Sequence, residues 1–146
     1  MKLATKREMN QLDQDAMSQY GIPSLLLMEH AAYGVFCYLM EEHQGKSVTI
    51  LCGSGNNGGD GLALARILYS FKKVQVQVVL LVEEEKLSSD GKVYYTICEK
   101  LGIPIYRYLE EMELVWELIE EAQVLVDAIF GTGLTRPITA VSYTHL

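Results

Sequence analysis

A glycine-rich segment near the middle of the chain carries the residue types best suited to binding phosphate. Residues 53–61 read Gly-Ser-Gly-Asn-Asn-Gly-Gly-Asp-Gly and follow a short apolar run at 49–52. Five glycines in nine positions allow unusual dihedral angles or a very close approach of a ligand to the backbone. Where such a loop enters a helix, the unpaired amides of the first turn and the helix dipole attract phosphate. The segment therefore predicts a nucleotide-like ligand.

A second polar segment follows another apolar run near the end of the chain. Residues 127–137 read Asp-Ala-Ile-Phe-Gly-Thr-Gly-Leu-Thr-Arg-Pro and come after the run at 124–126. In open parallel sheets, ligands bind beyond the carboxyl ends of the strands. If the two strands are neighbours, the two segments line one cleft, and we expect a single site there.

The glycines also match a dinucleotide fingerprint, Gly53-x-Gly55-x-x-Gly58, which is a weak signal taken alone. That fingerprint expects an acidic residue about 20 positions later to bind a ribose. The chain has Gln77 there, and the first acid is Glu83. A phosphate-loop NTPase is less favoured, because no lysine follows the glycines. An NAD-dependent oxidoreductase domain that uses Glu83 remains an alternative.

The elements that position these segments alternate between helices and strands. Periodicity predicts helices at 6–20, 24–42, 60–72, 90–101 and 110–121, and strands at 48–52, 74–82, 103–106 and 124–127. Thr5 and Glu8 form a capping box for the first helix, and Ser24 is the expected cap of the second. The strands are almost continuously apolar, as in parallel sheets covered on both faces. This predicts a Rossmann-like three-layer α/β/α sandwich with a mostly parallel sheet, in one domain spanning 1–146.

Composition excludes several classes of partner. The 146 residues carry a formal charge of −7, which argues against nucleic acid as the partner. No apolar run reaches the roughly 20 residues of a membrane span. We do not expect the first residues to be a secretory signal, because no apolar segment follows their basic side chains. Three scattered cysteines, at 37, 52 and 98, suit neither a disulfide framework nor a zinc site. We expect a reducing cytoplasm and a buried, unreactive role for Cys52.

The two polar segments are similar to the signature segments of the NAD(P)H-hydrate epimerases, the YjeF N-terminal domain family. Glu8-Met9, Leu12-Asp13 and the stretches 20–25 and 28–29 also resemble the amino-terminal helices of that family. The likeness covers about residues 5–140. It implies an isomerase that interconverts the R and S forms of hydrated NADH and NADPH (NADHX and NADPHX), so that a dehydratase can restore the cofactor.

The resemblance also implies roles for individual residues. Substrate contacts are expected from both segments: Asn56, Asn57, Gly58, Gly59, Asp60, Gly131, Thr132, Gly133, Leu134, Thr135, Arg136 and Pro137. Asn57 and Asp127 would bind a potassium ion, and their oxygen atoms are the hard donors that such a cation prefers. The amides of residues 58–61 suit the pyrophosphate of a dinucleotide. A homodimer and a fused or separate dehydratase partner follow from the same resemblance.

The chain departs from the family pattern at its carboxyl end. The resemblance places the catalytic aspartate in a later Asp-x-Pro-Ser-Gly segment, which this sequence lacks. We therefore expect the later strands to be missing, residues 141–146 to be a non-native tail, and the catalytic aspartate to lie beyond residue 146. A non-catalytic module that kept the fold to bind a protein is a second alternative.

Overall fold

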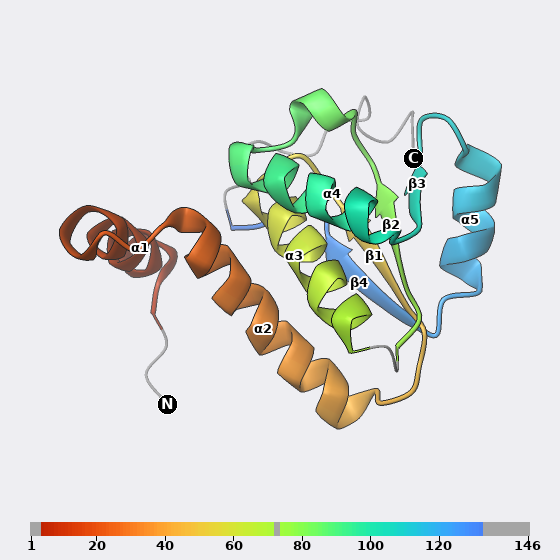
Figure 1. Cartoon of the computed structure of the whole chain (residues 1–146), viewed down its shortest axis with the longest axis horizontal. Helices are drawn as coiled ribbons and strands as arrows, with labels where there is room; N and C mark the ends of the chain where they lie inside the picture. The colour runs from red at the N-terminus through yellow and green to blue at the C-terminus, as the bar shows by residue number, and fades with distance from the viewer. Residues whose placement is uncertain (1–3, 72–73, 133–146) are drawn as a thin grey trace.

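A computed structural model describes residues 4–71 and 74–132, in which helices and parallel strands alternate (Figure 1). The elements in chain order are α1 (Lys6–Tyr20), α2 (Ser24–Glu42), β1 (Val48–Cys52), α3 (Asn56–Ser70), β2 (Val76–Leu80), η1 (Glu84–Lys86), α4 (Ser89–Leu101), β3 (Ile105–Arg107), α5 (Met112–Glu120) and β4 (Val124–Ala128). Every helix and strand expected from periodicity is present. None of the helices in these residues is long and apolar enough to cross a bilayer.

The four strands form one parallel sheet in the order β3-β2-β1-β4. Cys52, the last residue of β1, pairs with Ala128, the last residue of β4. The ladder continues one residue further, because the Gly53 N–H donates to the Ala128 carbonyl at 3.1 Å. The two polar segments therefore leave the sheet side by side at its carboxyl edge, which meets the condition for a shared cleft.

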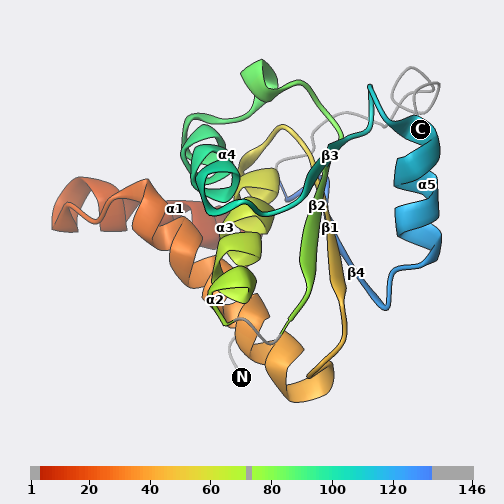
Figure 2. The same ribbon diagram turned by 45° about the vertical axis from the view of Figure 1, so that its right-hand side comes forward.

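Helices cover both faces of the sheet (Figure 2). On one face, α2, α3 and α4 bury the larger apolar core, which includes Ile50, Leu62 and Val78. On the other face, α5 packs through Val115 against Leu51 and Val79. This confirms the three-layer α/β/α sandwich. Cys52 is fully buried, in keeping with the unreactive role expected of it.

The glycine-rich segment differs from the prediction in its local structure. Helix α3 begins at Asn56, four residues before the predicted start at Asp60. Isolated glycines disfavour a helix, but tertiary packing overrides that intrinsic preference here. Asn56, Asn57 and Asp60 thus lie on the first turns of a helix rather than in a loop.

Of the two predicted caps of the amino-terminal helices, one is confirmed and one is wrong. Thr5 and Glu8 form the predicted capping box of α1. The predicted cap at Ser24 is wrong: Pro23 is the N-cap of α2, and it makes no side-chain cap bond. Its extended backbone, fixed by the proline ring, directs its carbonyl to the amides of Leu26 and Leu27.

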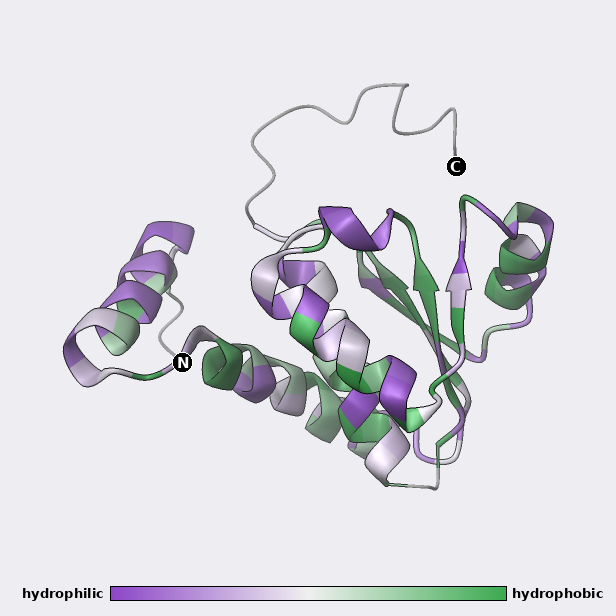
Figure 3. Cartoon of the chain, turned by 45° about the horizontal axis from the view of Figure 1, so that its top comes forward, coloured by the Kyte–Doolittle hydropathy of each residue, from purple (hydrophilic) through white to green (hydrophobic). Residues whose placement is uncertain are grey.

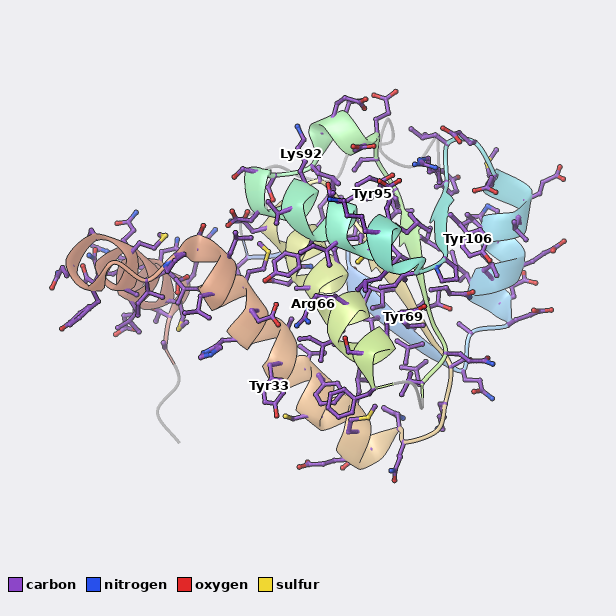
Figure 4. All side chains as sticks on the ribbon, viewed as in Figure 1. Tyr33, Arg66, Tyr69, Lys92, Tyr95 and Tyr106 are labelled. Carbon is purple, nitrogen blue, oxygen red and sulfur yellow. The ribbon has the colours of Figure 1, made fainter. Side chains whose placement is uncertain are left out.

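A polar cluster joins the three helices on the larger core. Arg66 of α3 lies between α2 and α3 (Figure 4) and forms an ion pair with Glu29 of α2. Tyr94 of α4 donates its hydroxyl hydrogen to Glu29 at 2.7 Å. Because both Glu29 oxygens are engaged from different helices, the cluster fixes α2 and α4 relative to α3, which carries the site.

Helix α1 has a different environment from the other helices. It projects from the rest of the molecule beside the start of α2 and is largely hydrophilic (Figure 3). None of its residues is buried. Burial of apolar side chains therefore does not explain the position of α1, and its polar residues have to be considered for other contacts.

Candidate functional site

A cleft of about 730 Å³ lies at the carboxyl edge of the sheet, where β1 and β4 end. Its described lining comes from three parts of the chain: Lys6, Asn10, Asp13, Ser54, Gly55, Asn56, Asn57, Asp60, Ile129, Phe130, Gly131 and Thr132. The prediction that the two polar segments share one cleft is confirmed. The contribution of α1 was not predicted.

Three glycines of the segment, Gly53, Gly58 and Gly61, lie where neighbouring atoms leave no room for a side chain. A Cβ on Gly58 would lie 2.0 Å from the Gly53 carbonyl oxygen, and one on Gly53 would lie 2.2 Å from the Ile129 carbonyl oxygen. A Cβ on Gly61 would lie 2.7 Å from the Ala128 Cβ. None of these three has a positive φ angle, so the expectation of unusual dihedral angles is wrong for them. They hold α3 tightly against the ends of β1 and β4.

Gly55 is the exception in this segment. It lines the cleft, and a Cβ there would meet nothing within 4 Å. It is the N-cap of α3 and makes no side-chain cap bond, so no side chain at that position occupies the amides of the first turn. The open space and the amides together make this the place where an anion can approach the helix.

The amides available to such an anion differ from those predicted. The Gly59 N–H already donates to the Gly55 carbonyl at 3.2 Å, as the first regular helical bond. Among the described residues, the donors without a helical partner are therefore those before it, on Asn56, Asn57 and Gly58, and not those of residues 59–61. The shift follows directly from the earlier start of α3.

The structure brings five of the predicted substrate-contacting residues into the cleft lining: Asn56, Asn57, Asp60, Gly131 and Thr132. The two segments touch there, because a Cβ on Gly131 would lie 3.1 Å from the Asn57 Cβ. Gly58 and Gly59 are buried beneath the cleft and do not line it. Gly133, Leu134, Thr135, Arg136 and Pro137, like residues 141–146, lie outside the described residues.

The two predicted potassium ligands have different surroundings. Asn57 lines the cleft, but Asp127 is not part of that lining. The Asp127 carboxylate accepts a hydrogen bond from the Ile129 N–H at 3.0 Å, which shapes the turn leading to Gly131. In type, both residues suit an alkali cation. In position, only Asn57 meets the cleft directly, and the described residues contain no group of three or more His, Cys, Asp or Glu side chains that could hold a metal ion.

Asp60 is the carboxylate of α3 in the cleft. Burial, and to a smaller extent the negative charge of Asp13, raises the pKa of the Asp60 carboxyl to about 6. Because burial disfavours the charged form, Asp60 retains a proton to higher pH than an exposed aspartate does. Such a group can donate a proton to a ligand near neutral pH.

Asp60→Asn is expected to stabilise the protein at pH 7.5 but not at pH 4. The folded pKa of about 6 exceeds the ordinary value of 3.8, so the folded state binds more protons between these values. Wild-type stability therefore falls as the pH rises from about 4 to about 6, and the asparagine variant escapes that loss. With Asp60 only partly buried, we expect a gain of about 1 kcal/mol at pH 7.5.

Urea unfolding of both proteins at the two pH values measures this difference. Glu41→Gln on the exposed face of α2 is the control, because it makes the same carboxyl-to-amide change at a residue that does not line the cleft. The same difference at both pH values for Asp60→Asn would show that its carboxyl ionises normally.

Two other features lie away from the cleft. A hollow of about 720 Å³ opens at the amino ends of the strands, where Gln77 donates to the Thr49 hydroxyl at 2.9 Å. It is at the opposite edge of the sheet from the glycine segment and contains none of the predicted site residues. Glu83, the ribose-binding candidate of the oxidoreductase alternative, pairs with Lys86 at 3.1 Å and does not line the cleft.

The chain is similar in sequence to one protein family and to curated members of it. The family described as YjeF-related protein N-terminus matches residues 24–146. The chain is 36% identical to an NAD(P)H-hydrate epimerase of Oenococcus oeni over 92% of its own length and 61% of that protein. It is 41% identical to a bifunctional NAD(P)H-hydrate repair enzyme Nnr of Moorella thermoacetica, over 91% of the chain and 26% of that protein.

A solved structure supports the same placement. The crystal structure of the yeast protein ynu0, YNL200c, is similar with a TM-score of 0.81 and 27% identity. The match covers 95% of this chain and 60% of the yeast chain. The chain thus spans about three fifths of the length of the relatives named NAD(P)H-hydrate epimerase that it matches.

Proposed function

This chain belongs to the family of YjeF-related protein N-termini, and on that premise we propose that it binds NADHX and NADPHX and serves their epimerisation. The reaction class is isomerisation of the R and S forms at the hydrated ring carbon. The observation that carries the proposal is the single cleft shared by the first turn of α3 and the segment after β4. The relatives named NAD(P)H-hydrate epimerase supply the identity of the substrate.

The cleft offers complementary groups for the two ends of such a substrate. Asn56 and Asn57 line the cleft beside the open position at Gly55, and their first-turn amides suit the pyrophosphate. Asn57, Asp60 and Thr132 present amide, carboxyl and hydroxyl groups for the polar edge of the damaged ring. The full substrate contact set includes residues 133–137, whose roles remain proposals from the family resemblance.

The proposed chemistry needs an acid near the added hydroxyl group. The ring nitrogen lone pair expels the protonated hydroxyl as water and leaves an iminium; water then adds to the opposite face and returns the proton. Asp60 can hold that proton near neutral pH, because burial raises the pKa of its carboxyl to about 6. In the family pattern the acid is a later aspartate, so we assign Asp60 to substrate binding.

We further propose a potassium ion beside Asn57. Asn57 lines the cleft, and its side-chain oxygen would be one donor to the ion. The Asp127 carboxylate, on the adjoining segment, would be the second. When bound, the ion would neutralise negative charge close to the pyrophosphate.

The decisive experiment uses one purified epimer of NADHX in potassium buffer and follows the other epimer by chromatography, with the Oenococcus oeni relative as the positive control. Calorimetry on the same samples compares the binding of NADHX with that of intact NADH. We expect NADHX to bind more tightly than NADH and epimerisation to be slower than with the Oenococcus oeni relative, because the family resemblance places the catalytic aspartate beyond residue 146. Equal binding of both nucleotides with no acceleration would favour the oxidoreductase alternative instead.

Partners of the whole protein are proposed from the relatives. The match covers only 26% of the Moorella repair enzyme, which is named as bifunctional, so we propose that a fused or separate dehydratase acts on the product epimer.

The exposed apolar side chains of Leu12, Tyr20, Tyr33 and Tyr38 on α1 and α2 support a homodimer. Light scattering of the purified chain would reject the dimer if it gave the monomer mass. The three free cysteines agree with a cytoplasmic location.

A further inference from the structure

Three polar residues of α1 share one face of that helix. Lys6, Asn10 and Asp13 are spaced by four and three residues, which places them on a single helical stripe. All three line the cleft at the carboxyl edge of the sheet. Helix α1 buries no residue in the apolar core, so its contribution to the molecule is this polar stripe in the lining of the cleft.

The charges in the cleft are unbalanced toward the negative. Within its described lining, Asp13 and Asp60 are acidic and Lys6 is the basic residue. The proposed substrate adds two more negative charges in its pyrophosphate. The amino end of α3 offers the equivalent of only about half a positive charge. The positive charge of Lys6 would therefore offset part of the negative charge that the nucleotide brings into the cleft.

We propose that α1 forms a third wall of the nucleotide site and that the Lys6 ammonium group contacts a phosphate of the bound substrate. This inference rests on the proposed function, because it takes the dinucleotide as the ligand. The two phosphate-binding elements then differ in their donors: α3 acts through its backbone amides and α1 through a side chain.

The test compares Lys6→Ala with Arg7→Ala. Both variants lose one positive charge from the first turn of the same helix, but Arg7 does not line this cleft. Calorimetric titration with NADHX should give about a tenfold weaker affinity for Lys6→Ala, the effect of one charge-assisted hydrogen bond. Arg7→Ala should stay within about twofold of wild type, because an exposed charge acts only at a distance.

Salt dependence supplies a second readout. The difference between Lys6→Ala and wild type should shrink several-fold between about 20 mM and 500 mM salt, because the lost contact is ionic and only partly shielded from solvent. Thermal unfolding of both variants checks that they remain folded. A purely structural role of Lys6 would move the unfolding temperature and leave the salt dependence unchanged.

The outcomes separate the two proposals. If wild type binds NADHX and Lys6→Ala binds as tightly as Arg7→Ala, then α1 is not part of the site, while the proposed function stands. If wild type fails to bind NADHX, the proposed function and this inference both fail.

Discussion

Replacing Gly58 by alanine is expected to lower the free energy of unfolding by about 3 kcal/mol and to abolish nucleotide binding. The added Cβ would lie 2.0 Å from the Gly53 carbonyl oxygen and 2.8 Å from the Gly53 carbonyl carbon. Those atoms are backbone, and Gly53 is itself held by a hydrogen bond from its N–H to Ala128. The helix therefore has to move away from the ends of the strands, and the cleft opens.

Gly55→Ala is the matched control, because it adds the same methyl group three residues earlier. Nothing lies within 4 Å of a Cβ there, and the φ angle of −82° suits any residue. Urea unfolding should show a loss below about 1 kcal/mol for this variant. Equal losses for the two variants would mean that glycine is required here for backbone conformation and not for contact.

Periodicity predicted the fold well because the elements are defined by local patterns and by burial. The strands are almost continuously apolar and the helices show helical apolar spacing, so element type and order follow. The start of α3 could not be predicted from local preference. Glycines at 58, 59 and 61 disfavour a helix in isolation, and their contacts with Gly53, Met28 and Ala128 become visible only in the assembled structure.

The candidate site was predictable where the fold dictates position. Two polar segments at the ends of adjacent parallel strands had to meet, and Asn57 and Gly131 do so. The residues of α1 were missed for a physical reason. Their spacing at positions 6, 10 and 13 was visible in the sequence, but nothing local says which surface a polar stripe faces.

The structure also separates two roles that glycine residues play in one segment. Gly53, Gly58 and Gly61 allow helix α3 to approach the sheet, and a larger residue at any of them would meet atoms within 3 Å. Gly55 lacks any such contact, so packing does not explain its presence. Glycine at the N-cap leaves the amides of the first turn without a side-chain acceptor, so a ligand can supply that acceptor.

Gly55→Asn should therefore make the protein slightly more stable and its nucleotide affinity about 30-fold weaker. Gly55 has the extended backbone of an N-cap, with φ −82° and ψ −171°, and its side-chain position is open. An asparagine oxygen there accepts from the Asn57 or Gly58 amide and stabilises the helix by a few tenths of a kcal/mol. It thereby occupies donors that the pyrophosphate needs, and each charge-assisted bond lost costs about 1.5–3 kcal/mol of binding.

Calorimetry with NADHX and urea unfolding on the same variant measure the two effects. Gly55→Ala is again the comparison, because its methyl group cannot accept a hydrogen bond and leaves the amides free. We expect its affinity to fall much less than that of the asparagine variant. If Gly55→Asn gains stability but binds NADHX as tightly as wild type, the phosphate does not bind at the amino end of α3. The cleft would then have to recognise the nucleotide through its side chains alone.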